Sequence, residues 1–164
     1  MPETNALHPE ELPIDIPAAA VDDLRDRLRR TRWPDVIEGA GWDYGLDVDV
    51  LRPIVSYWAE EFDWSAQQRR LNEFPHFRAV VDGAGIHYIH ARGRGPRPLP
   101  LLITHGWPGT FAEMLALIPL LTDPAAHGGS ADDAFDVVVP SMPGFGFSDR
   151  PTQPGMNTWR IAEL

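Results

Sequence analysis

The sequence predicts an α/β protein in two unlike parts, and three observations support this. Up to about residue 72, apolar residues recur at helical spacing and no segment has the pattern of a good strand. From residue 77 onward, apolar runs alternate with helical patterns, which is typical of a mostly parallel sheet with helices on it. An Asp-Gly pair flanked by apolar runs indicates a β-hairpin. We therefore expect a helical region over 1–76 and a sheet region over 77–164.

Three helices are expected in the first region. The first begins near Pro17, because proline is favoured in a first helical turn, and it ends before residues 31–34, Thr-Arg-Trp-Pro. The second takes Asp49 as its N-cap. The third opens at Ser65, where Gln68 three residues later completes a capping-box pattern.

The second region contains four expected strands. Residues 77–81 and 86–91 form the hairpin around Asp82-Gly83. Residues 99–104 are a nearly unbroken apolar run, which predicts a strand buried on both faces. Residues 135–139 are predicted to form a second buried strand.

Helices and loops separate these strands. Thr110 with Glu113 is another capping box and predicts a helix over the following residues, with Pro119 disturbing its last turn. Residues 122–134 are rich in Asp, Gly, Ala and Ser and predict a mobile surface loop. A further helix is expected to start near Asn157.

The composition excludes several classes of function. Asp and Glu number 24 against 14 Lys and Arg, all of them Arg, giving a net charge of −10, so the chain lacks the basic footprint of a nucleic-acid-binding or anionic-membrane-binding protein. Without cysteine there is no disulfide framework, thiolate metal site or Cys nucleophile. No apolar run suits a transmembrane helix and the first residues do not resemble a signal peptide, so we expect a cytoplasmic protein.

The sharpest motif is His105-Gly106-Trp107-Pro108-Gly109. It follows a predicted strand and precedes a capped helix, which is where ligands bind in open α/β sheets. Its glycines and proline shape a tight loop whose backbone N–H groups can stabilise a developing oxyanion. An ordinary strand-to-helix turn is the alternative.

A second motif covers residues 140–151, Pro-Ser-Met-Pro-Gly-Phe-Gly-Phe-Ser-Asp-Arg-Pro, after the last predicted strand. A loop this rich in Gly, Pro and Phe can pack on itself and line an apolar pocket. Taken alone, the motif favours a scaffolding role.

Together the two motifs resemble the α/β-hydrolase superfamily, and Trp107 with the second motif resembles epoxide hydrolases of the microsomal type. The first region resembles the domain that precedes the hydrolase core in that family. The resemblance covers about residues 14–164. The motifs that match this N-terminal domain are Thr31-Arg32-Trp33-Pro34, Tyr57-Trp58, Phe62-Asp63-Trp64, Leu71-Asn72, Phe74-Pro75, Asp82-Gly83 and Ile86-His87-Tyr88-Ile89-His90.

The resemblance implies the N-terminal portion of an enzyme that converts a small apolar epoxide and water into a diol, a detoxification reaction that needs no cofactor and no metal. A carboxylate opens the epoxide to a covalent ester, and a histidine-activated water hydrolyses the ester. The Trp107 N–H would be an oxyanion donor, Gly106 and Pro108 would shape its loop, and the Trp107–Pro108 bond would be cis. Trp107 would also line the substrate pocket.

Further site residues follow from the same resemblance. Phe145 would line the pocket beside the oxyanion loop. His105, Gly109 and Asp149 would have structural roles, His105 by packing and hydrogen-bonding beneath that loop. The base histidine of the family lies nearer its C-terminus, so His105 is not expected to be that base.

The sequence also departs from the family. It contains no Gly-x-Asp-x-Gly or Gly-x-Ser-x-Gly nucleophile elbow, which should follow the helix near Asn157. We therefore expect an N-terminal portion of an epoxide hydrolase that lacks the nucleophile, acid and base and is inactive by itself. Asp82, Asp136 and Asp149 are not at a strand–turn–helix elbow, so none of them is expected to be the nucleophile.

His87 and His90 are not expected to bind metal, because residues three apart in a strand point to opposite faces. Two other interpretations remain open. The chain could belong to another α/β-hydrolase, a haloalkane dehalogenase or an esterase, or it could be a non-catalytic fragment or interaction module. The unfinished sheet is expected to leave an open edge through which the chain self-associates.

Overall fold

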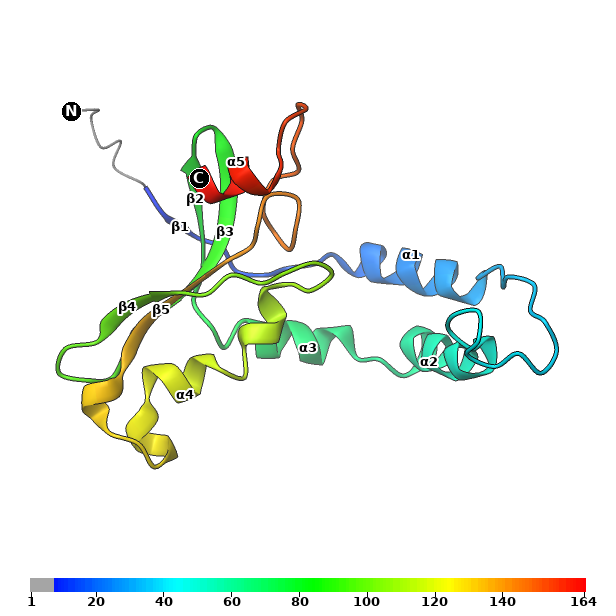
Figure 1. Cartoon of the computed structure of the whole chain (residues 1–164), viewed down its shortest axis with the longest axis horizontal. Helices are drawn as coiled ribbons and strands as arrows, with labels where there is room; N and C mark the ends of the chain where they lie inside the picture. The colour runs from blue at the N-terminus through cyan, green and yellow to red at the C-terminus, as the bar shows by residue number, and fades with distance from the viewer. Residues whose placement is uncertain (1–7) are drawn as a thin grey trace. The chain divides into compact units, whose positions relative to one another are not determined.

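A computed structural model describes residues 8–164 (Figure 1). The chain divides into two compact units. The helical unit comprises residues 15–71, and the sheet unit comprises residues 72–164 together with residues 8–14. The sequence pattern placed the boundary between the two regions near residue 76, and the two units meet at residues 71 and 72. Residues 8–14 belong to the sheet unit.

The helical unit contains the three expected helices, α1 (Ala18–Arg29), α2 (Val48–Glu60) and α3 (Trp64–Leu71). Pro17 immediately precedes α1, which ends before Thr31 as predicted. None of the helices among residues 8–164 is long and apolar enough to cross a membrane.

Two of the predicted helix caps are wrong. The N-cap of α2 is Asp47, whose side chain accepts a hydrogen bond from the Asp49 N–H at 2.9 Å, so Asp49 lies inside the first turn. α3 begins at Trp64, and the Asp63 carboxylate accepts from the Ala66 N–H in place of the expected Ser65 hydroxyl. In both places an earlier aspartate meets the exposed N–H groups first.

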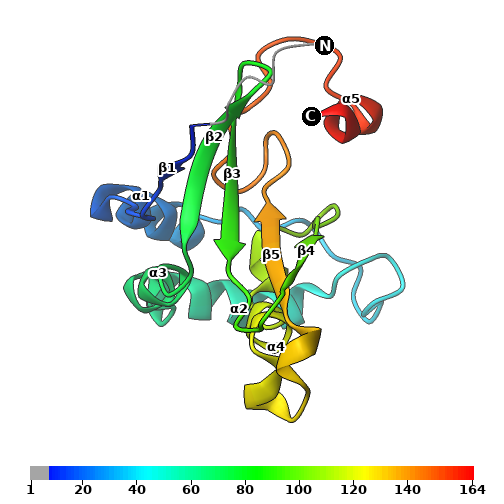
Figure 2. The ribbon, with the colours of Figure 1, turned by 90° about the vertical axis from the view of Figure 1, so that its left-hand side faces the viewer.

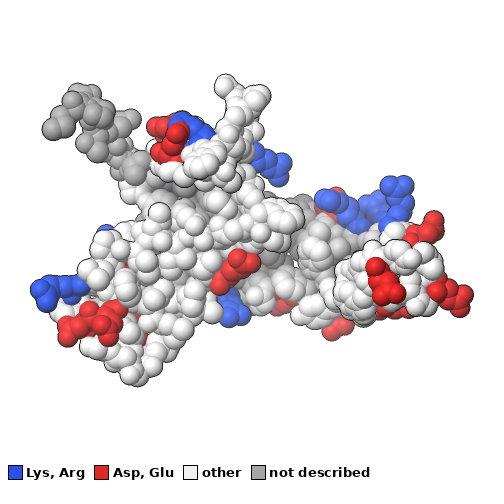
Figure 3. Space-filling model, viewed as in Figure 1, with Lys and Arg blue, Asp and Glu red and all other residues white. Residues whose placement is uncertain are grey.

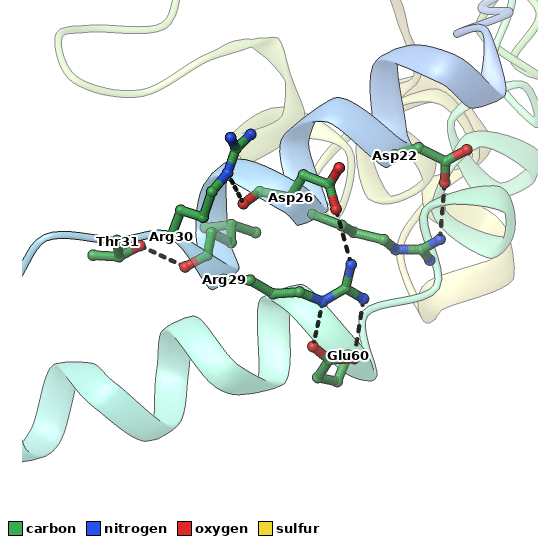
Figure 4. A network of polar contacts seen from close by, with 8 residues as sticks. Asp22, Asp26, Arg29, Arg30, Thr31 and Glu60 are labelled. Atoms are coloured by element: carbon green, nitrogen blue, oxygen red, sulfur yellow. Dashed lines mark hydrogen bonds and ion pairs between the residues drawn. The ribbon is translucent and has the colours of Figure 1, made fainter.

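An arginine fork ties α1 to α2 (Figure 4). Arg29 donates from Nε and Nη2 to the two carboxylate oxygens of Glu60, at 2.8 and 3.2 Å, and also pairs with Asp26. The hydrogen bond from Arg29 lowers the pKa of Glu60, and the same bond raises the pKa of Arg29. Both side chains are solvent-exposed, so the fork fixes the orientation of the two helices more than it stabilises the fold.

The sheet unit is built on a mixed five-stranded sheet with the order β1-β2-β3-β5-β4 (Figure 2). All neighbouring pairs are antiparallel except β4 and β5, which are parallel. The strands are β1 (Glu10–Glu11), β2 (His76–Val81), β3 (Ala84–Ala91), β4 (Leu99–Leu102) and β5 (Phe135–Pro140).

The hairpin of β2 and β3 is confirmed. Asp82 and Gly83 have φ values of 47° and 80°, and positive φ at both central residues is the geometry of a two-residue type I′ turn. Asp82 tolerates this conformation better than most residues because aspartate is among the few side chains enriched there.

A short strand that the sequence did not indicate begins the sheet. β1 has two residues and pairs with β2. Just beyond it, Asn72 holds the chain by two hydrogen bonds of 2.8 Å, accepting from the Ile14 N–H and donating to the Ile14 carbonyl oxygen. A strand this short has no periodicity of its own, and its place is set by pairing.

The expectation that residues 99–104 form a strand buried on both faces is wrong for the described chain. β4 ends at Leu102 and pairs only with β5, so it lies at an edge of the sheet. Leu99 and Leu102 are 61% and 64% exposed. The apolar run encodes a strand, but its burial depends on neighbours that residues 8–164 do not supply.

One face of the sheet carries the core of this unit. Ile89, Val137 and Val139 are fully buried on that face. The buried side chains of Phe111 and Ile118 belong to the segment that packs against β5. This core supports the carboxyl ends of β4 and β5.

That segment corrects the predicted long helix after Thr110. It consists of a single 3₁₀ turn, η1 (Phe111–Met114), and a separate short helix, α4 (Ile118–Thr122). Thr110 does cap η1, but it accepts from the Ala112 N–H at 3.3 Å and not from Glu113. Pro119 lies in the first turn of α4 and not in a last turn, because it has no N–H to continue a helix from η1.

The expected mobile loop over 122–134 contains two further 3₁₀ turns, η2 (Pro124–His127) and η3 (Ala131–Asp133). The side chains of Asp123 and Ser130 cap them. Two of the polar residues that suggested a loop are therefore capping groups. β5 and the final helix α5 (Thr158–Glu163) are confirmed, and Asn157 caps α5 by accepting from the Arg160 N–H at 3.0 Å.

Acidic and basic side chains lie next to one another on the face drawn in Figure 3. In the sheet unit, arginines pair with aspartates, as in Arg92–Asp136 at 2.9 Å and Arg94–Asp123 at 3.1 Å. On this face the acidic excess of the chain is therefore interspersed with arginine.

Replacing Asn72 by alanine should destabilise the sheet unit. The substitution removes two hydrogen bonds and leaves the N–H and carbonyl of the buried Ile14 without these partners, so we expect a loss of about 1–3 kcal/mol in the free energy of unfolding. Urea unfolding of Asn72→Ala against the exposed neighbour Glu73→Ala measures this loss. Equal midpoints for the two variants would show that the anchoring bonds contribute nothing.

Candidate functional site

The Trp107 turn, residues 105–109, follows β4 at the carboxyl end of the strand. The Ile103 N–H still donates to Val138 O at 2.9 Å, and the turn closes with a 2.7 Å hydrogen bond from the Gly109 N–H to Gly106 O. The Trp107–Pro108 bond is cis, as expected. Trp107 itself is 83% exposed, at the tip of a turn whose first residue, His105, is buried.

His105 forms the buried base of the turn. The residue is only 3% exposed, and its Nε2 atom accepts a hydrogen bond from the Met142 N–H at 3.2 Å. The ring of Phe145 packs against it with centroids 5.1 Å apart. His105 therefore links the Trp107 turn to the loop that follows β5, and its ring nitrogen is occupied by a structural bond.

The loop after β5, residues 140–155, packs on itself. Gly144 and Gly146 adopt φ values of 86° and 50°, which disfavour any side chain. The Gly144 N–H donates to Asp149 O, and the Phe145 N–H donates to Met142 O, both at 2.9 Å. These bonds fold the loop back toward the sheet, so that Phe145 faces His105.

A buried polar chain lies beside this loop, and the sequence analysis missed it. His76 Nδ1 lies 2.9 Å from His87 Nε2, and His87 Nδ1 lies 2.8 Å from Ser141 Oγ. His87 and Ser141 are completely buried, and His76 nearly so. Burial, and secondarily the neighbouring His76, lower the pKa of His87 to about 4, so the ring is neutral at pH 7.

The alternation of residues along β3 already indicated that His87 would be buried in this hydrogen-bonded row of side chains. Along β3, alternate residues are buried, and His87 falls on the buried side while His90 falls on the other. The two histidines therefore point to opposite faces, as expected. No cluster of three metal-ligating side chains occurs among residues 8–164.

The three aspartates weighed as nucleophiles each have a structural partner. Asp149 accepts from the Gly85 N–H at 2.9 Å and from Arg78, and these two bonds, in that order, lower its pKa. Asp136 does the same with Gly93 and Arg92, and Asp82 pairs with Arg160. The remaining expected site residues, Gly106, Pro108 and Gly109, all lie in the Trp107 turn.

An apolar cavity of about 640 Å³ lies on the opposite face of the sheet, beneath α5. Its walls come from alternate residues of the strands, such as Ile86 and Tyr88 of β3, and from Ile161 and Leu164 at the C-terminal end. Neither Trp107 nor Phe145 lines it. Thr104, which directly precedes the Trp107 turn, and Met142, whose N–H bonds His105, do line it.

Comparison with known proteins decides the family. Residues 9–114 match the family described as Epoxide hydrolase N terminus, and residues 100–164 match the alpha/beta hydrolase fold. The chain belongs to the epoxide hydrolase N-terminus family. The resemblance and the fold class expected from the sequence are both confirmed.

Curated relatives agree with this family assignment. The chain is 51% identical over 150 residues to the "Putative epoxide hydrolase" of Stigmatella aurantiaca (strain DW4/3-1), covering 92% of this chain and 34% of that protein. It is 42% identical over 148 residues to Epoxide hydrolase 1 of Oryctolagus cuniculus, covering 88% and 32%. The chain thus spans about a third of the length of these epoxide hydrolases.

Solved structures of epoxide hydrolases share the fold. The juvenile hormone epoxide hydrolase of the silkworm Bombyx mori superposes with a TM-score of 0.84 at 32% identity, over 96% of this chain and 42% of that one. The Aspergillus niger epoxide hydrolase superposes with a TM-score of 0.77 at 30% identity, over 90% and 38%. The sheet, its hairpin and the helical meander therefore belong to the epoxide hydrolase architecture.

The buried ring of His87 should make stability fall in mild acid. Its pKa is lower in the folded chain than the usual 6.5 of an unfolded one, so the unfolded chain takes up the proton first as the pH drops. This contribution is complete above pH 6.5 and is lost as the pH falls toward about 4, and it amounts to up to about 3 kcal/mol.

Urea unfolding at several values of pH between 7 and 4 measures the effect. His87→Gln should show a shallower decline than the unsubstituted chain, whereas His127→Gln, at an exposed position, should keep the full decline. Carboxylates such as Asp149 titrate in all three proteins and cancel in the comparison. Parallel curves for the unsubstituted chain and His87→Gln would contradict the assignment.

Proposed function

We propose that this chain is the N-terminal portion of an epoxide hydrolase and supplies an oxyanion donor, the Trp107 N–H, to a site completed by residues outside this sequence. The observation that supports it best is the exposed Trp107 turn at the carboxyl end of β4, in a chain whose relatives are epoxide hydrolases. Gly106 and Pro108 shape the turn, and His105 and Gly109 support it.

The chemistry is the addition of water across a strained C–O bond. A carboxylate oxygen attacks one epoxide carbon, the C–O bond breaks, and the departing oxygen takes a proton, giving a hydroxyalkyl ester. Water activated by a general base then attacks the ester carbonyl, and the tetrahedral oxyanion collapses to release a vicinal diol and the carboxylate. A backbone N–H aimed at that oxyanion lowers the barrier of the second step.

The substrate is proposed to be a small apolar epoxide. The indole of Trp107 is exposed, and the ring of Phe145 lies nearby on His105, so both can form an apolar wall beside the donor. The reaction requires no cofactor and no metal, since its groups are a carboxylate, a base and N–H donors. We further propose that the enzyme acts in the cytoplasm and detoxifies such epoxides.

The relatives favour this function over the alternatives considered. The named relatives and the two close structural neighbours are epoxide hydrolases, and the N-terminal helical region and Trp107 argue against a haloalkane dehalogenase or an esterase, which share the loop after β4. A non-catalytic interaction module is the second candidate. It is favoured by the absence of a nucleophile elbow from this sequence.

A chimaera tests the proposal. The matching third of Epoxide hydrolase 1 of Oryctolagus cuniculus is replaced by this chain, and styrene oxide hydrolysis is measured. We expect turnover, and we expect Trp107→Pro, which removes the N–H, to lower kcat by about 100-fold or more. Trp107→Phe keeps both the N–H and an aromatic ring and is the matched control.

The polypeptide of these 164 residues should show no turnover of styrene oxide above a buffer blank, since it contains no nucleophile elbow. Multiple turnovers by this polypeptide would contradict the assignment of the nucleophile to another part of the enzyme. A fully active Trp107→Pro chimaera would contradict the oxyanion role of the turn.

We also propose that the 164-residue polypeptide self-associates through β4. This edge strand exposes Leu99 and Leu102 and leaves one row of backbone N–H and C=O groups without a strand partner in the described sheet, which is a template for pairing. Size-exclusion chromatography with light scattering should show oligomers. Lysine at both leucines should shift the chain toward monomer, whereas Leu120→Lys in α4 should not. A single monomeric peak for the unsubstituted chain would contradict the proposal.

A further inference from the structure

Three hydrogen bonds fasten the loop after β5 to a single residue of β3, His87, and a fourth bond within the loop completes the set. The His87 N–H donates to Ser148 Oγ at 2.9 Å, and the His87 carbonyl accepts from the Ser141 N–H at 2.8 Å. The His87 ring meets Ser141 Oγ at 2.8 Å. Ser148 Oγ then donates to Ser141 O at 2.7 Å and closes the set. Both ends of the motif are thereby held at His87.

The ring of His87 permits only matched proton arrangements. A neutral imidazole donates from one nitrogen and accepts at the other. If Ser141 donates to Nδ1, then Nε2 of His87 donates to His76, and if His76 donates to Nε2, then Nδ1 donates to Ser141. In either arrangement both ring nitrogens are satisfied, so one neutral ring ties β2, β3 and the loop together.

A serine hydroxyl beside an imidazole suggests a nucleophile with its base, but this pair is sealed. Ser141 and His87 are both 0% exposed. Phe111 and Phe147 pack against the His87 ring, with centroids at 4.9 and 5.3 Å. A Cβ atom on Gly146 would lie 2.4 Å from Ser141 Oγ. No substrate has room to reach the hydroxyl, so the pair acts through position and not by attack.

The next residue carries this anchoring to the Trp107 turn. Met142 follows Ser141 directly, and its N–H donates to Nε2 of His105, the residue that begins the turn. Phe145, within the same anchored loop, packs on the His105 ring. A shift of Ser141 would therefore displace the donor that holds His105.

The geometry points to Ser141 and His87 as positioning residues for the Trp107 turn. Their hydrogen bond sets the register of the loop after β5, and through Met142 and His105 this register fixes the base of the turn. The catalytic consequence rests on the proposed function, but the positioning itself is a property of this chain. Ser141→Ala removes the hydroxyl without adding bulk and is the informative variant.

Hydrogen–deuterium exchange on the full chain measures the positioning directly. In Ser141→Ala we expect the amides of residues 105–110 and 140–149 to exchange about tenfold faster, which is the effect of losing one buried hydrogen bond. The amides of β2 should keep their exchange rates. Ser130→Ala is the matched control, because it removes a capping hydroxyl in η3 and should leave the turn unchanged. The ring ¹⁵N shifts of His105 should move in Ser141→Ala only.

Two results would overturn the inference: unchanged exchange in residues 105–110, or a uniform acceleration over the whole sheet. If Ser141→Ala does not fold, Ser141→Cys provides the same comparison, since it keeps a side chain of similar shape but replaces the hydroxyl on His87 by a thiol that hydrogen-bonds only weakly. In the chimaera, Ser141→Ala should lower kcat more than it changes KM. Faster exchange with an unchanged kcat would uphold the positioning and refute the oxyanion role of Trp107.

Discussion

A fully buried imidazole in the middle of a sheet needs a hydrogen-bond partner for each ring nitrogen, because an unpaired polar atom there costs free energy. His87 meets this constraint with His76 on one side and Ser141 on the other. Phe111 and Phe147 pack against the His87 ring. Burying this ring therefore also fixes the positions of the turn after residue 110 and of the loop after β5. Much of the sheet unit is arranged around this one side chain.

The motif at residues 140–151 becomes intelligible once this constraint is known, since most of its residues have a separate contact. Ser141 bonds the ring, the Met142 N–H bonds His105, and Gly146 leaves room for the Ser141 hydroxyl. The remaining contacts are Phe145 on His105, Phe147 on His87, Ser148 on the backbone of residues 87 and 141, and Asp149 on the Gly85 N–H. The scaffolding role expected of this loop therefore consists of contacts that join β3 to His105.

The Trp107 turn combines a buried base with an exposed tip. His105 is held by the loop after β5, while Trp107 lies in solvent at the carboxyl end of β4. This division suits a donor that must be rigid before its ligand arrives, because a preorganised N–H needs no rearrangement at the moment of reaction. The buried base and the exposed tip both lie within a chain that spans about a third of the relatives' length.

The sequence alone determined what depends on neighbours along the chain: the Asp-Gly hairpin, α1, β5, the helix that starts near Asn157 and, through two motifs, the family. The tertiary structure decided what depends on distant partners. β1 exists only because β2 pairs with it, β4 lies at an edge, and the helix expected after Thr110 is interrupted before Pro119. Strand alternation placed His87 inside, but its partners His76 and Ser141 lie 11 and 54 residues away in sequence, so only the folded chain could bring them together.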